Sequence, residues 1–275
     1  MRKILVFALA LMVVFGMSGL VLANNESTVE QTGGFQTATV NQTGDNKVEI
    51  YQLTDNDGSQ IATSNQNGIG NVIYIDQSQV GGGGNGTNTA YANQVGDNNN
   101  IWQETYAGGY NGGQHVWASQ DGDDNVIDQY ISGGYTNNFY AEQIGSENIA
   151  NQIMNANHSH GYIYQDGDNN DAYQEFTGSN HGYMSSGIII DQLGDDNEAD
   201  QNIFGGSLGT KTEAYIYQTG DNNIASQTIN GANNYNNIVQ DGNNNDAIAN
   251  QTGNGNSSDV IQDGDGNISV VNQSN

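Results

Sequence analysis

Acidic side chains dominate the groups of this 275-residue chain that could bind a ligand, with 31 Asp and Glu against four Lys and Arg. Carboxylates clustered in Gly- and Asn-rich segments are the oxygen ligands that calcium prefers. The clustered aspartates are Asp121, Asp123, Asp124, Asp166, Asp168, Asp195, Asp196, Asp221, Asp263 and Asp265. The chain lacks a complete EF-hand loop and the Gly-Gly-x-Gly-x-Asp calcium nonapeptide. Because Asp also favours turns and slows aggregation, we expect no cofactor, with calcium as the alternative.

Catalytic groups are poorly represented. His158 and His160 have the spacing of a metal pair, but their Gly-, Asn- and Ser-rich surroundings indicate a solvated loop with no evident third ligand. The serines are scattered without a nucleophile elbow, and acidic pairs are too frequent to single one out. We therefore predict that the chain is not an enzyme.

Side-chain amides follow a regular pattern, and regularly spaced amides can hydrogen-bond to one another. The unit Gln-x-Gly-x-x-Asn-x-(Ala/Ile) recurs along the chain, and most copies start 22 to 28 residues apart. The predicted ladder amides are Gln66, Asn71, Gln94, Asn99, Gln120, Asn125, Gln143, Asn148, Gln165, Asn170, Gln192, Asn197, Gln218, Asn223, Gln240, Asn245, Gln262 and Asn267. The predicted turn glycines are Gly68, Gly96, Gly122, Gly145, Gly167, Gly194, Gly220, Gly242 and Gly264. The upstream copy that begins at Gln42 fits the unit only if one residue of the unit is deleted.

The elements that position these amides must be strands, because residues on one face of a strand lie two apart. After a turn, Asn125, Ile127 and Gln129 share a face, and before the next turn Phe139 and Ala141 do so. The opposite face carries Tyr, Trp and Glu. The chain contains no Pro, which would remove a donor from stacked strands, and no Cys.

One strand–turn–strand unit cannot bury its own apolar face, whereas stacked units can. The sequence therefore predicts an all-β fold, a β-solenoid of about ten stacked strand–turn–strand repeats forming two parallel, amyloid-like sheets. Gln would lie over Gln and Asn over Asn, with Ala, Ile and Val between the sheets.

The start of the chain is typical of a secretory signal peptide. Arg2 and Lys3 precede an apolar run that ends in Val-Leu-Ala at residue 23. We predict a signal peptide at 1–23, a short N-terminal segment at 24–30 and the repeat solenoid at 31–275. No later apolar run is long enough for membrane insertion.

The predicted mature chain keeps two basic residues, Lys47 and Lys211, so its formal charge is −29. Phosphate binding needs clustered Lys and Arg, which excludes nucleic acid as a partner.

The repeats resemble those of the curlin family, which read Ser-x5-Gln-x-Gly-x-x-Asn-x-Ala-x3-Gln. The segment 240–251 matches from the first Gln onward, and 66–77 differs only at Ile73. In six central copies the closing Gln follows the Asn by four residues instead of six, on the same face. The resemblance implies a secreted subunit of an extracellular fibre on the bacterial surface, a homopolymer that grows from a nucleator subunit after export through an outer-membrane pore.

Two other functions remain open at this stage. A soluble secreted adhesin with the same fold would stay monomeric, and an ice-binding solenoid would need a regular Thr array, which only Thr37 and Thr39 resemble. The chain lacks the divergent basic last repeat of a nucleator, so we favour the bulk subunit.

Overall fold

The computed structural model describes residues 24–55, 58–79, 86–107, 113–133, 136–178, 186–205 and 211–275. Regular structure in these ranges consists of strands, and no helix long and apolar enough to cross a bilayer occurs there. The predicted signal peptide at 1–23 lies outside the described residues. The strands are β1 (Glu26–Thr32), β2 (Gln36–Thr54), β3 (Ser59–Gln79), β4 (Thr87–Val95), β5 (Asn100–Ala107), β6 (Gln114–Asp121), β7 (Val126–Gly133), β8 (Asn137–Ile144), β9 (Ile149–Asn155), β10 (Ser159–Asp166), β11 (Asp171–Thr177), β12 (Ser186–Leu193), β13 (Glu198–Phe204), β14 (Glu213–Thr219), β15 (Ile224–Asn230), β16 (Tyr235–Asp241), β17 (Asp246–Thr252), β18 (Ser257–Asp263) and β19 (Ile268–Ser274).

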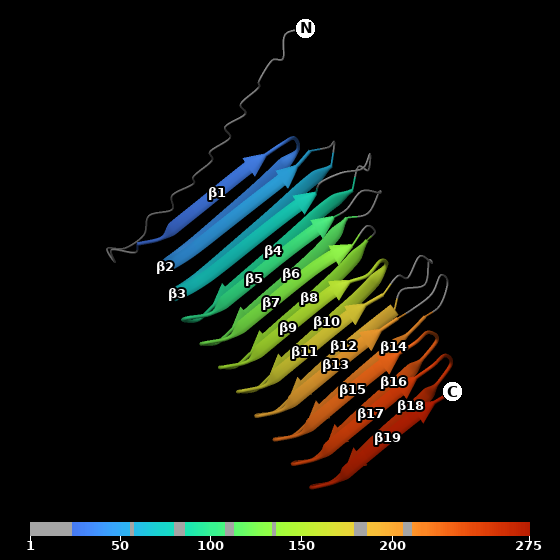
Figure 1. Cartoon of the computed structure of the whole chain (residues 1–275). Coiled ribbons are helices and arrows are strands. Elements are labelled where there is room, and N and C mark those ends of the chain that lie inside the picture. Colours follow the sequence, from blue (N-terminus) through green and yellow to red (C-terminus); the bar gives the residue numbers. More distant parts are fainter. Residues whose placement is uncertain are drawn as a thin grey trace, which may run out of the picture.

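The strands pair in parallel between successive turns of the chain: the long strands β2 and β3 pair with each other, and the shorter strands from β4 onward pair with the next strand but one. Thus β4 pairs with β6, β5 with β7, and so on to β17 with β19. The chain thus winds as a β-solenoid of about nine turns (Figure 1), which confirms the predicted fold.

Two stacks of strands result. We call "first stack" the column formed by 36–45 of β2, 59–69 of β3 and the even-numbered strands β4 to β18. The "second stack" is formed by β1, 47–54 of β2, 72–79 of β3 and the odd-numbered strands β5 to β19.

The long strands β2 and β3 pass from the first stack to the second. Their pairing keeps register from Gln36 to Asp45 and resumes one residue out of step at Lys47. This irregularity coincides with the copy of the repeat that lacks one residue before Asn46. The one-residue shift in register compensates for the shorter turn. Gln42 therefore still lies beside Gln66, and Asn46 still begins the second-stack part of β2.

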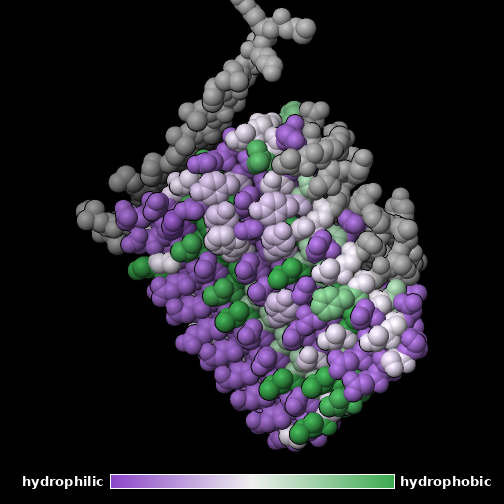
Figure 2. Space-filling model, in the orientation of Figure 1, coloured by the Kyte–Doolittle hydropathy of each residue, from purple (hydrophilic) through white to green (hydrophobic). Residues whose placement is uncertain are grey.

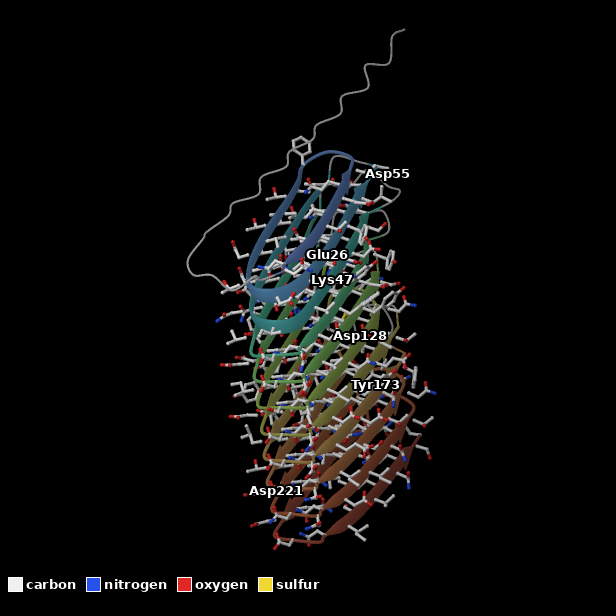
Figure 3. The ribbon with its side chains drawn as sticks, turned by 90° about the vertical axis from the view of Figure 1, so that its left-hand side faces the viewer. Glu26, Lys47, Asp55, Asp128, Tyr173 and Asp221 are labelled. Atoms are coloured by element: carbon white, nitrogen blue, oxygen red, sulfur yellow. The ribbon has the colours of Figure 1, made fainter. Side chains whose placement is uncertain are left out.

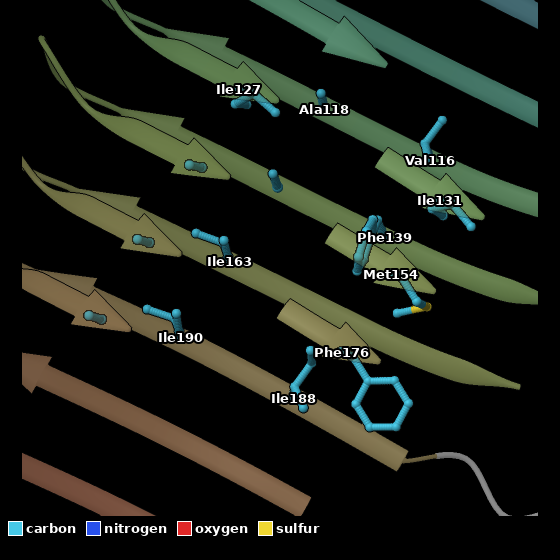
Figure 4. Close-up of a cluster of buried hydrophobic side chains, with 14 of the residues drawn as sticks. Val116, Ala118, Ile127, Ile131, Phe139, Met154, Ile163, Phe176, Ile188 and Ile190 are labelled. Carbon is cyan, nitrogen blue, oxygen red and sulfur yellow. The ribbon is translucent and has the colours of Figure 1, made fainter. Parts of the chain in front are cut away.

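A hydrophobic core lies between the two stacks. Its side chains come from alternate positions of each strand, as in β8, where Phe139 and Ala141 are buried and Tyr140 is half-buried on the outer face. Figure 4 shows Ile, Val, Met and Phe side chains from both stacks meeting in this layer. The parity predicted from the sequence places these residues correctly because a strand exposes its two faces alternately.

The turns from first-stack to second-stack strands are stacked as closely as the strands. All the predicted turn glycines have positive φ, for example 108° at Gly145, and a second left-handed residue follows two positions later, as at Glu147. A Cβ at Gly145 would lie 2.1 Å from the carbonyl oxygen of Gly167 in the next turn. These turns form the hydrophilic margin on the left of Figure 2.

We predict that Gly145→Ala destabilises the solenoid by at least about 2 kcal/mol, because it adds left-handed strain to a backbone clash. Gly187→Ala is the matched control, since its Cβ would meet only the Tyr215 hydroxyl at 3.9 Å. Urea unfolding of freshly desalted monomer measures both. Equal midpoints for the two variants would contradict this account of the turns.

Candidate functional site

A continuous ladder of glutamine side chains runs the length of the first stack. Each Nε2 donates to Oε1 of the glutamine one layer further on, at 2.8–2.9 Å. Its members are Gln42, Gln66, Gln94, Gln120, Gln143, Gln165, Gln192, Gln218, Gln240 and Gln262. The bonds all point toward the C-terminal end, so the ladder has a direction.

The remaining hydrogen of each amide joins the two stacks. Gln143 donates to the backbone carbonyl of Val126 at 3.0 Å, and Val126 lies in the second stack. In return, Gln129 of the second stack donates to the carbonyl of Trp117 in the first stack at 3.1 Å. Gln143 and Gln129 therefore each use both donors, one along the stack and one across the core.

The asparagines form a second ladder at the start of each second-stack strand. Asn148 donates its backbone N–H to Oδ1 of Asn125 at 3.0 Å, and its Nδ2 donates to the carbonyl of Gly167 at 2.7 Å. The same pattern repeats from Asn46 to Asn267. Every predicted ladder amide is buried except Asn267, in the last layer. This ladder fastens each strand to the next turn.

The glutamine column of the second stack changes position twice. Gln31, Gln52 and Gln77 are bonded in series, as are Gln251 and Gln273, and each lies six residues after its Asn. In the six layers between them the glutamine lies four residues after its Asn, two positions earlier in the strand. The members there are Gln103, Gln129, Gln152, Gln174, Gln201 and Gln227.

Each change of position breaks the ladder. Gln103 lies beside Ile75 and Gln251 beside Ile229, so the Oε1 atoms of both glutamines are buried without a hydrogen-bond partner. The sequence contains the signal for these breaks, since the interval from Asn to the closing Gln shortens from six residues to four. Parity alone predicted the face correctly, but the consequence for the ladder needs the register of neighbouring layers.

The turn carboxylates also act between layers. Oδ1 of Asp195 accepts the backbone N–H of Asp168 at 2.8 Å, and Oδ1 of Asp221 accepts that of Asp195 at 3.0 Å. Within the ranges that the structure describes, no group of three or more His, Cys, Asp or Glu side chains could hold a metal ion. His160 contacts Asn138 through Nδ1 at 2.9 Å. Asp195 and Asp221 therefore link neighbouring turns as hydrogen-bond acceptors.

Aromatic side chains form columns on the outer faces. Trp117 stacks on Tyr140 with ring centroids 3.9 Å apart in the first stack, and Tyr74 stacks on Trp102 at the same distance in the second. Carboxylates lie among these aromatic side chains, such as Asp128, labelled in Figure 3, which lies beside Trp102 on the outer face of β7. Burial raises the pKa of Asp128, and the negative charge of Glu104 adds to the shift.

Both ends of the solenoid expose strand edges. Among the described residues β18 pairs only with β16 and β19 only with β17. A Cβ at Gly264 would meet nothing within 4 Å, unlike the equivalent glycines in the preceding turns. Unpaired N–H and C=O groups on such an edge can pair with a strand of another chain.

The ladder predicts a cost for its interruption. Gln165→Leu removes the bonds with Gln143 and Gln192, both 2.8 Å long, and leaves a buried donor and a buried acceptor unpaired. We expect a loss of about 3 kcal/mol. Asn151→Leu, on the outer face of β9, is the control and should change stability by less than about 1 kcal/mol. Urea unfolding of the monomer measures both losses of stability. Equal losses for the two variants would contradict the stabilising role of the ladder.

The outer-face carboxylates predict that stability rises as pH falls from 7 toward 4. Because the folded-state pKa of Asp128, Asp171, Asp191 and Asp200 is raised, the folded chain binds more protons than the unfolded chain between the ordinary and the raised values. Asp128→Asn should raise stability at pH 7 and flatten the pH dependence. Urea midpoints across this range test it, and a midpoint that falls on acidification would contradict it.

Comparisons with known proteins add no relative. No protein-family model matches the chain, and no curated protein matches it.

Proposed function

We propose that this chain is the structural subunit of an extracellular, curli-like amyloid fibre and that copies add head to tail through their strand edges. One observation carries the proposal: among the described residues the first-stack ladder ends at Gln262, whose Nε2 donates across the core to the backbone carbonyl of Asp246 and to no further glutamine. At the other end Gln42 begins the same ladder. A second copy supplies the missing neighbour for both.

The direction of the ladders favours an open polymer over a closed dimer. In the first-stack glutamine ladder every donor points toward the C-terminal end, so a C-terminal edge complements an N-terminal edge and not another C-terminal edge. Such a head-to-tail contact repeats without closing and gives a filament. The parallel pairing inside the chain would continue across each junction.

The biological setting follows from the resemblance of the repeats to curlin repeats. We propose a fibre of the biofilm matrix on a bacterial surface that serves adhesion and cell aggregation. Its partners would be copies of itself, a nucleator subunit and an outer-membrane secretion pore. Neither nucleic acid nor an inserted membrane segment takes part.

Purified chain 24–275 tests this function. We expect thioflavin fluorescence after a lag, abolition of the lag by sonicated fibres of the same chain, and no effect of fibres of an unrelated sequence. Fibre diffraction should give a meridional reflection near about 4.8 Å. A chain that stays monomeric at high concentration, with unchanged fluorescence, would instead be a soluble adhesin.

A further inference from the structure

The two ends of the solenoid are not equivalent. At the C-terminal end β18 and β19 form a complete layer with one strand in each stack. At the N-terminal end β1 covers residues 47–53 of β2, whereas 36–45 of β2 pair only with β3 among the described residues. The second stack therefore has one strand more than the first.

The strand that covers this edge has the same inward-facing side chains as the last strand. In β1 and the residue before it these are Asn25, Ser27, Val29 and Gln31, and in β19 and the residue before it Asn267, Ser269, Val271 and Gln273. No other described strand of the second stack has Asn, Ser, Val and Gln in this order. In the neighbouring layer, for example, the series is Asn46, Val48, Ile50 and Gln52.

We propose, on the basis of the fibre function above, that β1 occupies in the single molecule the place that β19 of a second copy takes in the fibre. Growth then requires β1 to leave residues 47–53 of β2 so that β19 of the neighbour can pair there. The docking surface is the long edge of β2 that faces the N-terminal end of the solenoid. Its occupant is the C-terminal layer of another copy, β18 and β19.

The hydrogen bonds made by β1 can all be made by β19. Gln31 donates to Oε1 of Gln52 at 2.7 Å, and Oδ1 of Asn25 accepts the N–H of Asn46 at 3.1 Å. Gln273 and Asn267 carry the same groups at the same spacing. Both ends also keep the closing Gln six residues after the Asn, so Gln273 meets Gln52 and not Ile50.

Replacement of β1 by β19 of the neighbour makes both stacks continuous across the junction, whereas pairing of β19 on top of β1 leaves the first stack interrupted. If β19 paired with β1 of the neighbour, the first stack would lack a strand at every junction. Residues 36–45 of β2 would then lie roughly 9.6 Å from β18, two strand spacings instead of one. Gln262 could not reach Gln42 across that gap. With β1 displaced, β18 meets 36–45 and β19 meets 47–53 in the same step.

The charge pattern is compatible with the exchange. The outward residues Glu26 and Glu30 of β1 lie beside Lys47 and Tyr51 of β2. Those of β19 are uncharged, and they include Ile268, 79% exposed, and Val270, 58% exposed. Replacing β1 by β19 therefore removes two carboxylates from the junction of a strongly acidic chain and covers two exposed apolar side chains.

Inward-facing substitutions at the two ends test the exchange, because they should act in opposite directions. Val29→Asn weakens β1, so elongation of wild-type seeds should become about tenfold faster if β1 is detached only about a tenth of the time in the wild type. Val271→Asn weakens the incoming strand and should slow elongation by a similar factor. Thr28→Asn and Val270→Asn, on the outward faces of the same strands, are the matched controls. If Val29→Asn slows elongation as Val271→Asn does, β1 is the acceptor strand and the proposal is overturned.

A reversible lock gives a second measurement that does not depend on weakening a strand. Thr28 and Glu49 lie opposite each other in β1 and β2, and the chain has no Cys of its own. Oxidised Thr28→Cys/Glu49→Cys should add to seeds once and then stop elongation, and reduction should restore growth. Equal elongation in both states would overturn the exchange. Failure of the wild-type chain to form fibres at all would instead overturn the proposed function.

Discussion

The hydrogen bond from a side-chain amide of one layer to the same amide of the next is the interaction on which the structure depends. A buried amide without partners costs about 1–3 kcal/mol for each unpaired group, and here whole columns are buried. Gln143 avoids that cost only because Gln120 and Gln165 lie directly beside it, one strand spacing away on either side. The core therefore requires strict register between layers, and successive turns must stack at the same spacing as successive strands. This explains the glycines that leave no room for a Cβ.

Register also divides the molecule into zones. In the central layers of the second stack the glutamine occupies the position that Ile50, Ile75 or Ala249 takes nearer the ends, and Met154, Phe176 or Ile203 takes the place of the closing glutamine. At two places along the stack, the glutamine and the apolar residue exchange positions between one layer and the next. Each exchange leaves one buried side-chain oxygen without a hydrogen-bond partner, Oε1 of Gln103 at the first and Oε1 of Gln251 at the second. The two ends consequently match each other, although neither matches the centre.

Much of this could be predicted from the sequence because period-two alternation and the Gln-Gly-Asn spacing are local. They gave the fold, the buried face and the residues of the ladders, including the short turn before Asn46. The second-stack ladder breaks could not be predicted, because they depend on which layers become neighbours. The boundary at residue 31 also differs from the structure, where β1 begins at Glu26. Residues 25–31 keep the Asn-to-Gln interval but lack the preceding Gln and Gly, so no repeat was evident there.

In the fibre that we propose, an unequal N-terminal end would delay polymerisation while the chain is alone. An edge of 19 residues with both halves open would accept any neighbour at once, whereas β1 keeps the second half of β2 satisfied while the chain is alone. The first half, 36–45, pairs only with β3 among the described residues, so under the proposed exchange β18 of another copy would pair there before β1 leaves. Exchange can then proceed residue by residue, with each bond lost by β1 replaced by an equivalent bond to β19. Such an exchange would keep the barrier low and would still give a junction as continuous as the interior of the solenoid.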